Sequence, residues 1–120
     1  MAVRNFKDLL VWQKGIELVE ETYKLVKYLP KDEIYALSDQ MRRAAVSVPS
    51  NIAEGQQRKS DKEFANFLSF ARGSVAELET QFIICVRLGF LSEVQAELPI
   101  NMCQELYKML NNFISKLGNE

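Results

Sequence analysis

The chain has 120 residues, of which 48% are hydrophobic and 26% are charged, and its formal net charge is −1. This length suits one domain, spanning 1–120, and the small number of Gly and Pro residues excludes a disordered or low-complexity chain. A net charge near zero also excludes a protein that coats nucleic acid by bulk positive charge, so any anion site must be a local patch.

Four helices are predicted in chain order, at about residues 6–29, 33–54, 61–88 and 92–117. Ser and Asn residues at three of the starts can accept hydrogen bonds from free helix N–H groups, each with an acidic or amide residue three positions later. These pairs are Asn5 with Asp8, Ser60 with Glu63 and Ser92 with Gln95. Short connections between long helices predict an all-α, antiparallel, up-down-up-down four-helix bundle.

Glycine and proline mark further expected features of these helices. Gly55, Gly89 and Gly118 stand where helices are expected to stop, because glycine enters a left-handed terminal turn without a side-chain clash. Pro49 is expected to kink or divide the second helix, and Pro99 to bend or restart the fourth.

Two apolar runs, at 9–12 and 82–86, are too continuous to face a single core. A helix turns about 100° per residue, so consecutive apolar side chains point in several directions and need cover on more than one side. The simplest cover is a second copy of the chain, which predicts a homo-oligomer. The expected interface residues are Leu10, Val11, Trp12, Ile83 and Val86.

Several kinds of catalytic chemistry are excluded by composition. The chain contains no histidine, which removes di-iron centres with Glu-x-x-His motifs, Ser-His-Asp triads and His-ligated zinc. Glu17, Glu20 and Glu21 are interpreted as a solvated helix face. Cys85 and Cys103 lie in apolar helical patterns and are expected to be reduced core thiols. No metal, no cofactor and no enzymatic activity are predicted.

The expected location is the cytoplasm. No apolar run reaches the roughly 20 residues that a membrane span needs, and no signal peptide pattern is present. No membrane partner is predicted.

A polar stripe is predicted to join the second and third helices. Its residues recur at helical spacing beside apolar rows, and they are Gln40, Arg43, Ser47, Asn51, Glu54, Ser74 and Glu77. We expect Arg43 to pair with Glu77 or Glu54, because a buried charge must find a partner. A role in fixing helix register is favoured over a chemical role.

The stripe lies within a longer resemblance. The run Gln40-Met41-Arg42-Arg43-Ala44-Ala45-Val46-Ser47-Val48-Pro49-Ser50-Asn51-Ile52-Ala53-Glu54-Gly55 resembles the signature of the 23S ribosomal RNA intervening-sequence proteins, also called the four helix bundle protein family. Phe6, Leu9, Val11, Trp12, Gln13 and Lys14 are similar to the opening motif of that family. Phe64, Phe67, Leu68, Gly73, Ser74, Glu77 and Leu78 are similar to its third helix.

The resemblance implies a four-helix bundle that assembles as a ring, commonly a homopentamer. Similarity extends to the accessory variability protein of diversity-generating retroelements, which works with a reverse transcriptase and nucleic acid. For most members of the family no activity is established.

Two functions from different classes follow. The first is binding of the RNA or DNA backbone through a basic patch, repeated around the oligomer, whose residues are Arg42, Arg58, Lys59 and Lys62. No aromatic residue is interleaved in this patch to stack on bases. The alternative is a scaffold or accessory subunit that contacts a protein partner, such as a larger enzyme, and no nucleic acid.

Overall fold

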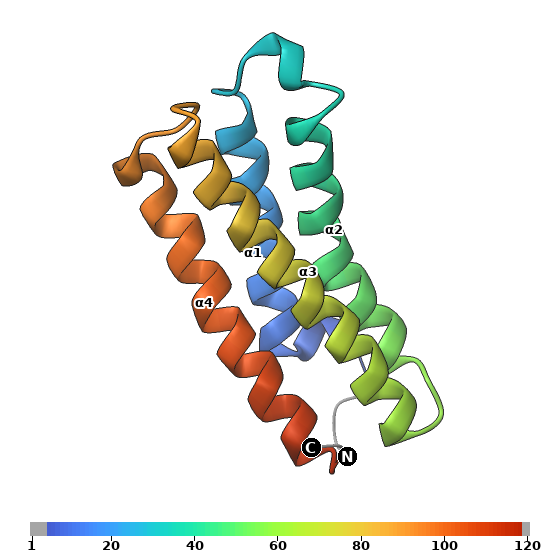
Figure 1. Ribbon diagram of the computed structural model, residues 1–120. Coiled ribbons are helices and arrows are strands. Elements are labelled where there is room, and N and C mark those ends of the chain that lie inside the picture. The colour runs from blue at the N-terminus through green and yellow to red at the C-terminus, as the bar shows by residue number, and fades with distance from the viewer. Residues whose placement is uncertain (1–4, 119–120) are drawn as a thin grey trace.

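The computed structural model describes residues 5–118, which form four long α-helices and two short 3-10 helices and contain no strand. The elements are η1 (Phe6–Asp8), α1 (Leu10–Val26), η2 (Lys31–Glu33), α2 (Leu37–Gln56), α3 (Asp61–Arg87) and α4 (Glu93–Lys116). Consecutive long helices run antiparallel in a bundle 45 Å long (Figure 1). The predicted all-α four-helix architecture is therefore confirmed.

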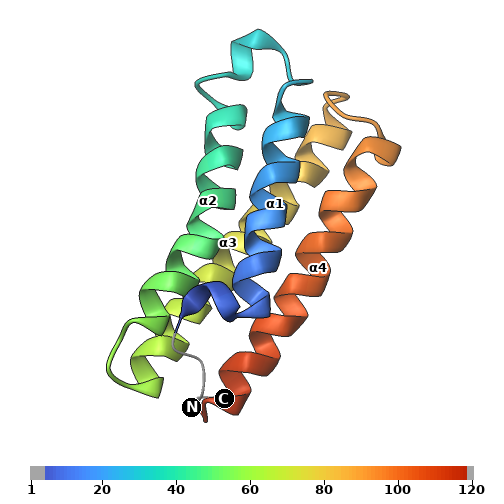
Figure 2. The ribbon, with the colours of Figure 1, turned by 180° about the vertical axis from the view of Figure 1, so that it is seen from behind.

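Each long helix packs against two others. Both α1 and α3 contact α2 and α4, so α1 and α3 lie on one diagonal of the bundle (Figure 2). The core between them contains fully buried side chains from all four helices, including Leu18, Met41, Phe82 and Leu110. None of the helices in the described residues combines the length and apolar character that a membrane span requires.

The caps of α3 and α4 form as predicted. The Ser92 hydroxyl accepts from the Gln95 N–H at 3.0 Å, while the Gln95 side chain accepts from the Ser92 N–H at 2.9 Å. The Ser60 hydroxyl likewise accepts from the Glu63 N–H at 3.2 Å. These bonds satisfy donors that a helix start otherwise leaves free, and they fix where the two helices begin.

The first two predicted helices are shorter than expected. Leu9 is buried in an extended conformation, which separates η1 from α1, and α1 ends at Val26 rather than near residue 29. The second helix begins at Leu37, because the chain first makes the separate turn η2 and then a bend through Ile34. Periodicity alone did not reveal these interruptions.

Two of the three predicted glycine stops are confirmed. Gly89 and Gly118 have φ values of 78° and 80°, the left-handed region that favours glycine. Gly55 is the penultimate residue of α2 and does not adopt the left-handed conformation, so the predicted reason for this glycine is wrong although α2 ends one residue later, at Gln56. A Cβ atom at Gly55 would lie 2.6 Å from the Cβ of Phe67, so glycine is needed for the close approach of α3.

Neither proline divides its helix. Both Pro49 and Pro99 are buried, and α2 and α4 continue through them. A Cβ atom at Gly15 of α1 would lie 3.4 Å from the ring of Pro49, which is ordinary van der Waals contact, so the ring packs directly against α1. Of the two alternatives predicted at each proline, division of α2 near residue 48 and restart of α4 near residue 99 are therefore wrong.

Candidate functional site

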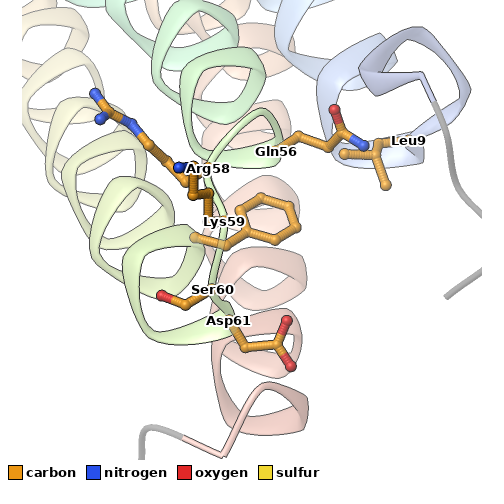
Figure 3. A pocket seen from close by; sticks show the side chains of 7 residues that line it. Leu9, Gln56, Arg58, Lys59, Ser60 and Asp61 are labelled. Carbon is orange, nitrogen blue, oxygen red and sulfur yellow. The ribbon is translucent and has the colours of Figure 1, made fainter.

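The α2–α3 loop, which carries Arg58 and Lys59 of the predicted basic patch, borders a cleft of about 210 Å³. The loop, η1 and the end of α4 all lie at one end of the bundle, which we call the loop end (Figure 1). The cleft is lined by Leu9, Gln56, Arg58, Lys59, Ser60, Asp61 and Phe64 (Figure 3). It therefore joins the start of α1 to the start of α3.

Arg58 is engaged within the chain. Its guanidinium donates to a Glu54 carboxylate oxygen at 2.7 Å, and its central carbon lies 4.7 Å from the centroid of the Phe67 ring. The side chain points away from the cleft and towards α3 (Figure 3). An ion pair combined with a cation–π contact holds Arg58 in place, so this residue is less available for phosphate than the sequence suggested.

The charges of the loop are nearly balanced. Lys59 and Lys62 are exposed, and neither forms an ion pair within residues 5–118. Asp61 and Glu63 alternate with them in the sequence, however, and place carboxylates on the first turn of α3. The available positive charge is therefore confined to two lysines.

The fourth predicted member of the basic patch lies elsewhere. Arg42 donates to the Ile34 carbonyl oxygen at 3.0 Å and lies 3.9 Å from an Asp39 carboxylate oxygen. The rise of 1.5 Å per residue puts it about 24 Å from Arg58 along α2. The prediction of one patch containing all four cations is wrong, because a helix carries residues so far apart in sequence to opposite ends of the bundle.

Part of the predicted polar stripe joins α2 to α3. The Ser47 and Ser74 hydroxyl oxygens are 2.9 Å apart, and the Asn51 amide donates to the Ser47 hydroxyl and to the Ser47 carbonyl oxygen, each at 2.8 Å. These three half-buried residues form a compact network across the contact between the two helices.

The charged members of the stripe do not join this network. Arg43 donates to Asp39 at 3.0 Å, and 79% of its side chain is exposed. Glu54 pairs with Arg58, and Glu77 is exposed. The predicted pairing of Arg43 with Glu77 or Glu54 is therefore wrong, because these side chains lie on the solvent side of their helices. The remaining member, Gln40, is exposed as well.

An aromatic cluster next to the loop was missed from the sequence. The Phe67 ring lies under Arg58 and meets Phe70 edge-on with 5.6 Å between centroids. No simple spacing rule predicts the contact between Gly55 and Phe67, because Gly55 lies one residue before the end of α2 whereas Phe67 lies six residues after the start of α3.

The predicted interface residues lie in several environments. Trp12 lines an apolar groove of about 280 Å³ between α1 and α2, which we call the α1–α2 groove, together with Ile16, Val19, Val46, Pro49, Ser50 and Ala53. Ile83 and Val86 line the α3–α4 groove, of about 270 Å³, together with Arg87, Glu93, Ala96 and Ile100. Leu10 is 57% exposed outside both grooves, whereas Val11 is only 5% exposed. Val11 belongs to the core, so its assignment to a subunit interface is wrong.

The two cysteines are free and buried, as predicted. The Cys85 thiol lies 3.6 Å from the sulfur of Met41. Burial, with a smaller contribution from the charge of Glu33, raises the pKa of Cys85 to about 11. Burial, with a smaller contribution from the charge of Glu79, raises the pKa of Cys103 to about 12. Both thiols are therefore protonated and unreactive at neutral pH. Within residues 5–118, no cluster of acidic and cysteine side chains is suited to hold a metal ion.

Comparison with known proteins places this bundle among relatives. A crystal structure from Bacteroides thetaiotaomicron, of a protein of unknown function from the S23 ribosomal protein family, is similar with a TM-score of 0.81. The two chains share 27% sequence identity, and the match covers 88% of this chain and 98% of the other. No protein with curated function matches. The family model for 23S rRNA-intervening sequence proteins matches residues 7–112. The chain therefore belongs to the 23S rRNA-intervening sequence protein family.

Proposed function

We propose that this protein is a non-enzymatic homo-oligomer that serves as a scaffold for a larger partner. The observation that carries the proposal is the pair of apolar grooves on opposite sides of the bundle. One lies between α1 and α2, the other lies between α3 and α4, and α1 and α3 occupy a diagonal. Apolar surface of this kind typically marks an interaction site.

Two different grooves favour contact between unlike faces. When one face of a subunit meets a different face of the next, the contacts continue from copy to copy and form a ring if the rotation closes. The family resemblance suggests a ring of five. Every subunit of such a ring would present the same end of its bundle to a partner, which multiplies weak contacts.

The test uses one charged substitution in each groove. Val46 and Ile83 are 41% and 43% exposed, so Val46→Asp and Ile83→Asp should leave the bundle folded. By light scattering, we expect an oligomer for the wild type and a clearly smaller mass for each variant, because each variant has lost one of the two grooves. An equimolar mixture of the two variants should have a larger mass than either variant alone, because each supplies the groove that the other has lost.

The matched control is Val94→Asp, which changes an 83% exposed valine outside both grooves. It should retain the wild-type mass. A monomeric wild type, or variants that keep the wild-type mass, would remove the proposal. Circular dichroism checks that each variant keeps its helices.

Binding of nucleic-acid backbone is the second candidate. It is favoured by Lys59 and Lys62, which flank the start of the 27-residue helix α3, where the helix dipole adds partial positive charge. Contacts to phosphate alone would be weakly selective for sequence and would weaken steadily as salt rises. The balanced charges of the loop place this function second to the scaffold.

Charge reversal tests the second candidate directly. Lys59→Glu combined with Lys62→Glu should abolish salt-dependent binding of labelled RNA and DNA in fluorescence anisotropy, while Arg58 keeps its structural contacts. The control is a second double variant, Lys27→Glu with Lys31→Glu, which reverses the charge of two exposed lysines at the opposite end of the bundle. Equal affinity of the two double variants would exclude the loop as the binding site.

A further inference from the structure

The outward side of α3 carries an unusual ridge of side chains. Successive steps of three or four residues place Lys62, Asn66, Phe70, Gly73 and Glu77 on one face, and all five are exposed. The solvent side of a bundle helix is normally polar. Here Phe70 is 58% exposed, and Ile84, seven residues beyond Glu77, is 38% exposed.

Gly73 is the most informative residue of this ridge. Glycine inside a helix costs about 1 kcal/mol relative to alanine. A Cβ atom at Gly73 would meet no other atom within 4 Å, whereas one at Gly55 would collide with Phe67. Packing within the described chain therefore explains Gly55 but not Gly73. Close approach of another molecule would account for a glycine at this position.

The charges of the ridge match those of a second copy of the ridge that runs in the opposite direction. Lys62 and Glu77 lie eight and seven residues on either side of Phe70, and neither forms an ion pair within residues 5–118. If two such helices meet antiparallel about a two-fold axis beside Phe70, each Lys62 faces the other copy's Glu77. Asn66 then faces Gly73, and the two Phe70 rings flank the axis.

We propose that α3 packs antiparallel against α3 of a second copy of this chain through the ridge Lys62–Glu77. This contact is isologous, since the same surface is used on both copies. It is distinct from the two grooves and does not depend on them. Glycine allows the helix axes to approach closely, and opposite charges set the register.

Disulfide trapping tests the register. In the proposed dimer, cysteines that replace Phe70 in the two copies lie beside the axis, whereas cysteines that replace Asn66 are separated by about 10 Å along it. A disulfide requires Cα atoms within about 7 Å. Phe70→Cys should therefore cross-link under mild oxidation, and Asn66→Cys should not. Cys85 and Cys103 are buried and should not compete.

Substitutions that exchange the charges of Lys62 and Glu77, made in the Phe70→Cys variant, test the proposed ion pairs. Lys62→Glu alone and Glu77→Lys alone place like charges opposite each other, so each should lower the cross-linking yield several-fold. The double exchange restores opposite charges and should recover the yield, a result that a purely local effect of either residue would not produce.

Three results would overturn the proposal: no cross-link at position 70, equal yields at positions 66 and 70, or failure of the double exchange to recover the yield. Protection of the introduced cysteine by added RNA, without cross-linking, would instead assign the ridge to nucleic acid. Val46→Asp and Ile83→Asp should leave the cross-link intact, so failure of the groove proposal and failure of this one are distinguishable.

Discussion

Replacing Gly55 with alanine should destabilise the protein, although alanine is the better helix former. The added Cβ atom would lie 2.6 Å from the Cβ of Phe67, 3.0 Å from the ring of Phe64 and 3.3 Å from the carbonyl oxygen of Phe64. The Cβ of Phe67 is bonded directly to the backbone, so rotation of a side chain cannot relieve the shortest contact. Instead, α2 and α3 must move apart near the α2–α3 loop.

The magnitude follows from two opposing contributions. Overpacking of this kind costs about 1–3 kcal/mol, and a clash against backbone-anchored atoms belongs in the upper part of that range. The higher helix propensity of alanine relative to glycine stabilises the helix by about 1 kcal/mol. The expected net loss is about 1–2 kcal/mol. With an unfolding entropy of about 0.25 kcal/mol/K for a chain of this length, the melting temperature should fall by about 4–8 °C.

The assay is thermal and urea unfolding followed by circular dichroism, in dilute solution and at one protein concentration. Gly73→Ala is the matched control, since its new methyl group enters open space and should raise the free energy of unfolding by up to about 1 kcal/mol. The free energy of unfolding of Gly15→Ala should lie between those of Gly55→Ala and Gly73→Ala, because the nearest contacts of its new Cβ atom are at 3.4 Å. A Gly55→Ala variant as stable as Gly73→Ala would refute the reasoning.

Four further predictions concern charge, thiols and caps. Arg43→Ala should lower the free energy of urea unfolding by no more than about 0.5 kcal/mol, because its pair with Asp39 is largely solvated. Thiol reagents at pH 8 should label Cys85 and Cys103 only after denaturant is added, and rapid labelling of the native protein would contradict their burial. Since burial raises the pKa of both thiols above the ordinary value of about 9, the unfolded chain loses these protons first. Stability should therefore fall as pH rises from about 9 towards 11, a trend that Cys→Ser variants would diminish. Ser92→Ala removes the α4 cap and should cost about 1 kcal/mol in the same unfolding assay, whereas the exposed Ser115→Ala should cost little.

The candidate surfaces were only partly predictable from sequence. Ser47, Asn51 and Ser74 meet as expected, because their spacing keeps them on the facing sides of two antiparallel helices. Arg43 and Glu77 occupy the same periodic rows, yet they lie far enough round each helix to face solvent. A pattern of residue types specifies a broad face of a helix, and a difference of one residue is 100°.

The sequence by itself determined the four helices, the caps of α3 and α4, the terminal glycines at 89 and 118 and the family, since these depend on local residue patterns. Tertiary structure alone decided which residues meet. It separated Arg42 from the loop cations, placed Arg58 over Phe67 and gave Gly55 its role in close packing. Local patterns specify where a helix begins and which broad side is apolar, whereas contacts between helices depend on their relative rotation and separation. Those two quantities are set when all the side chains at an interface pack together.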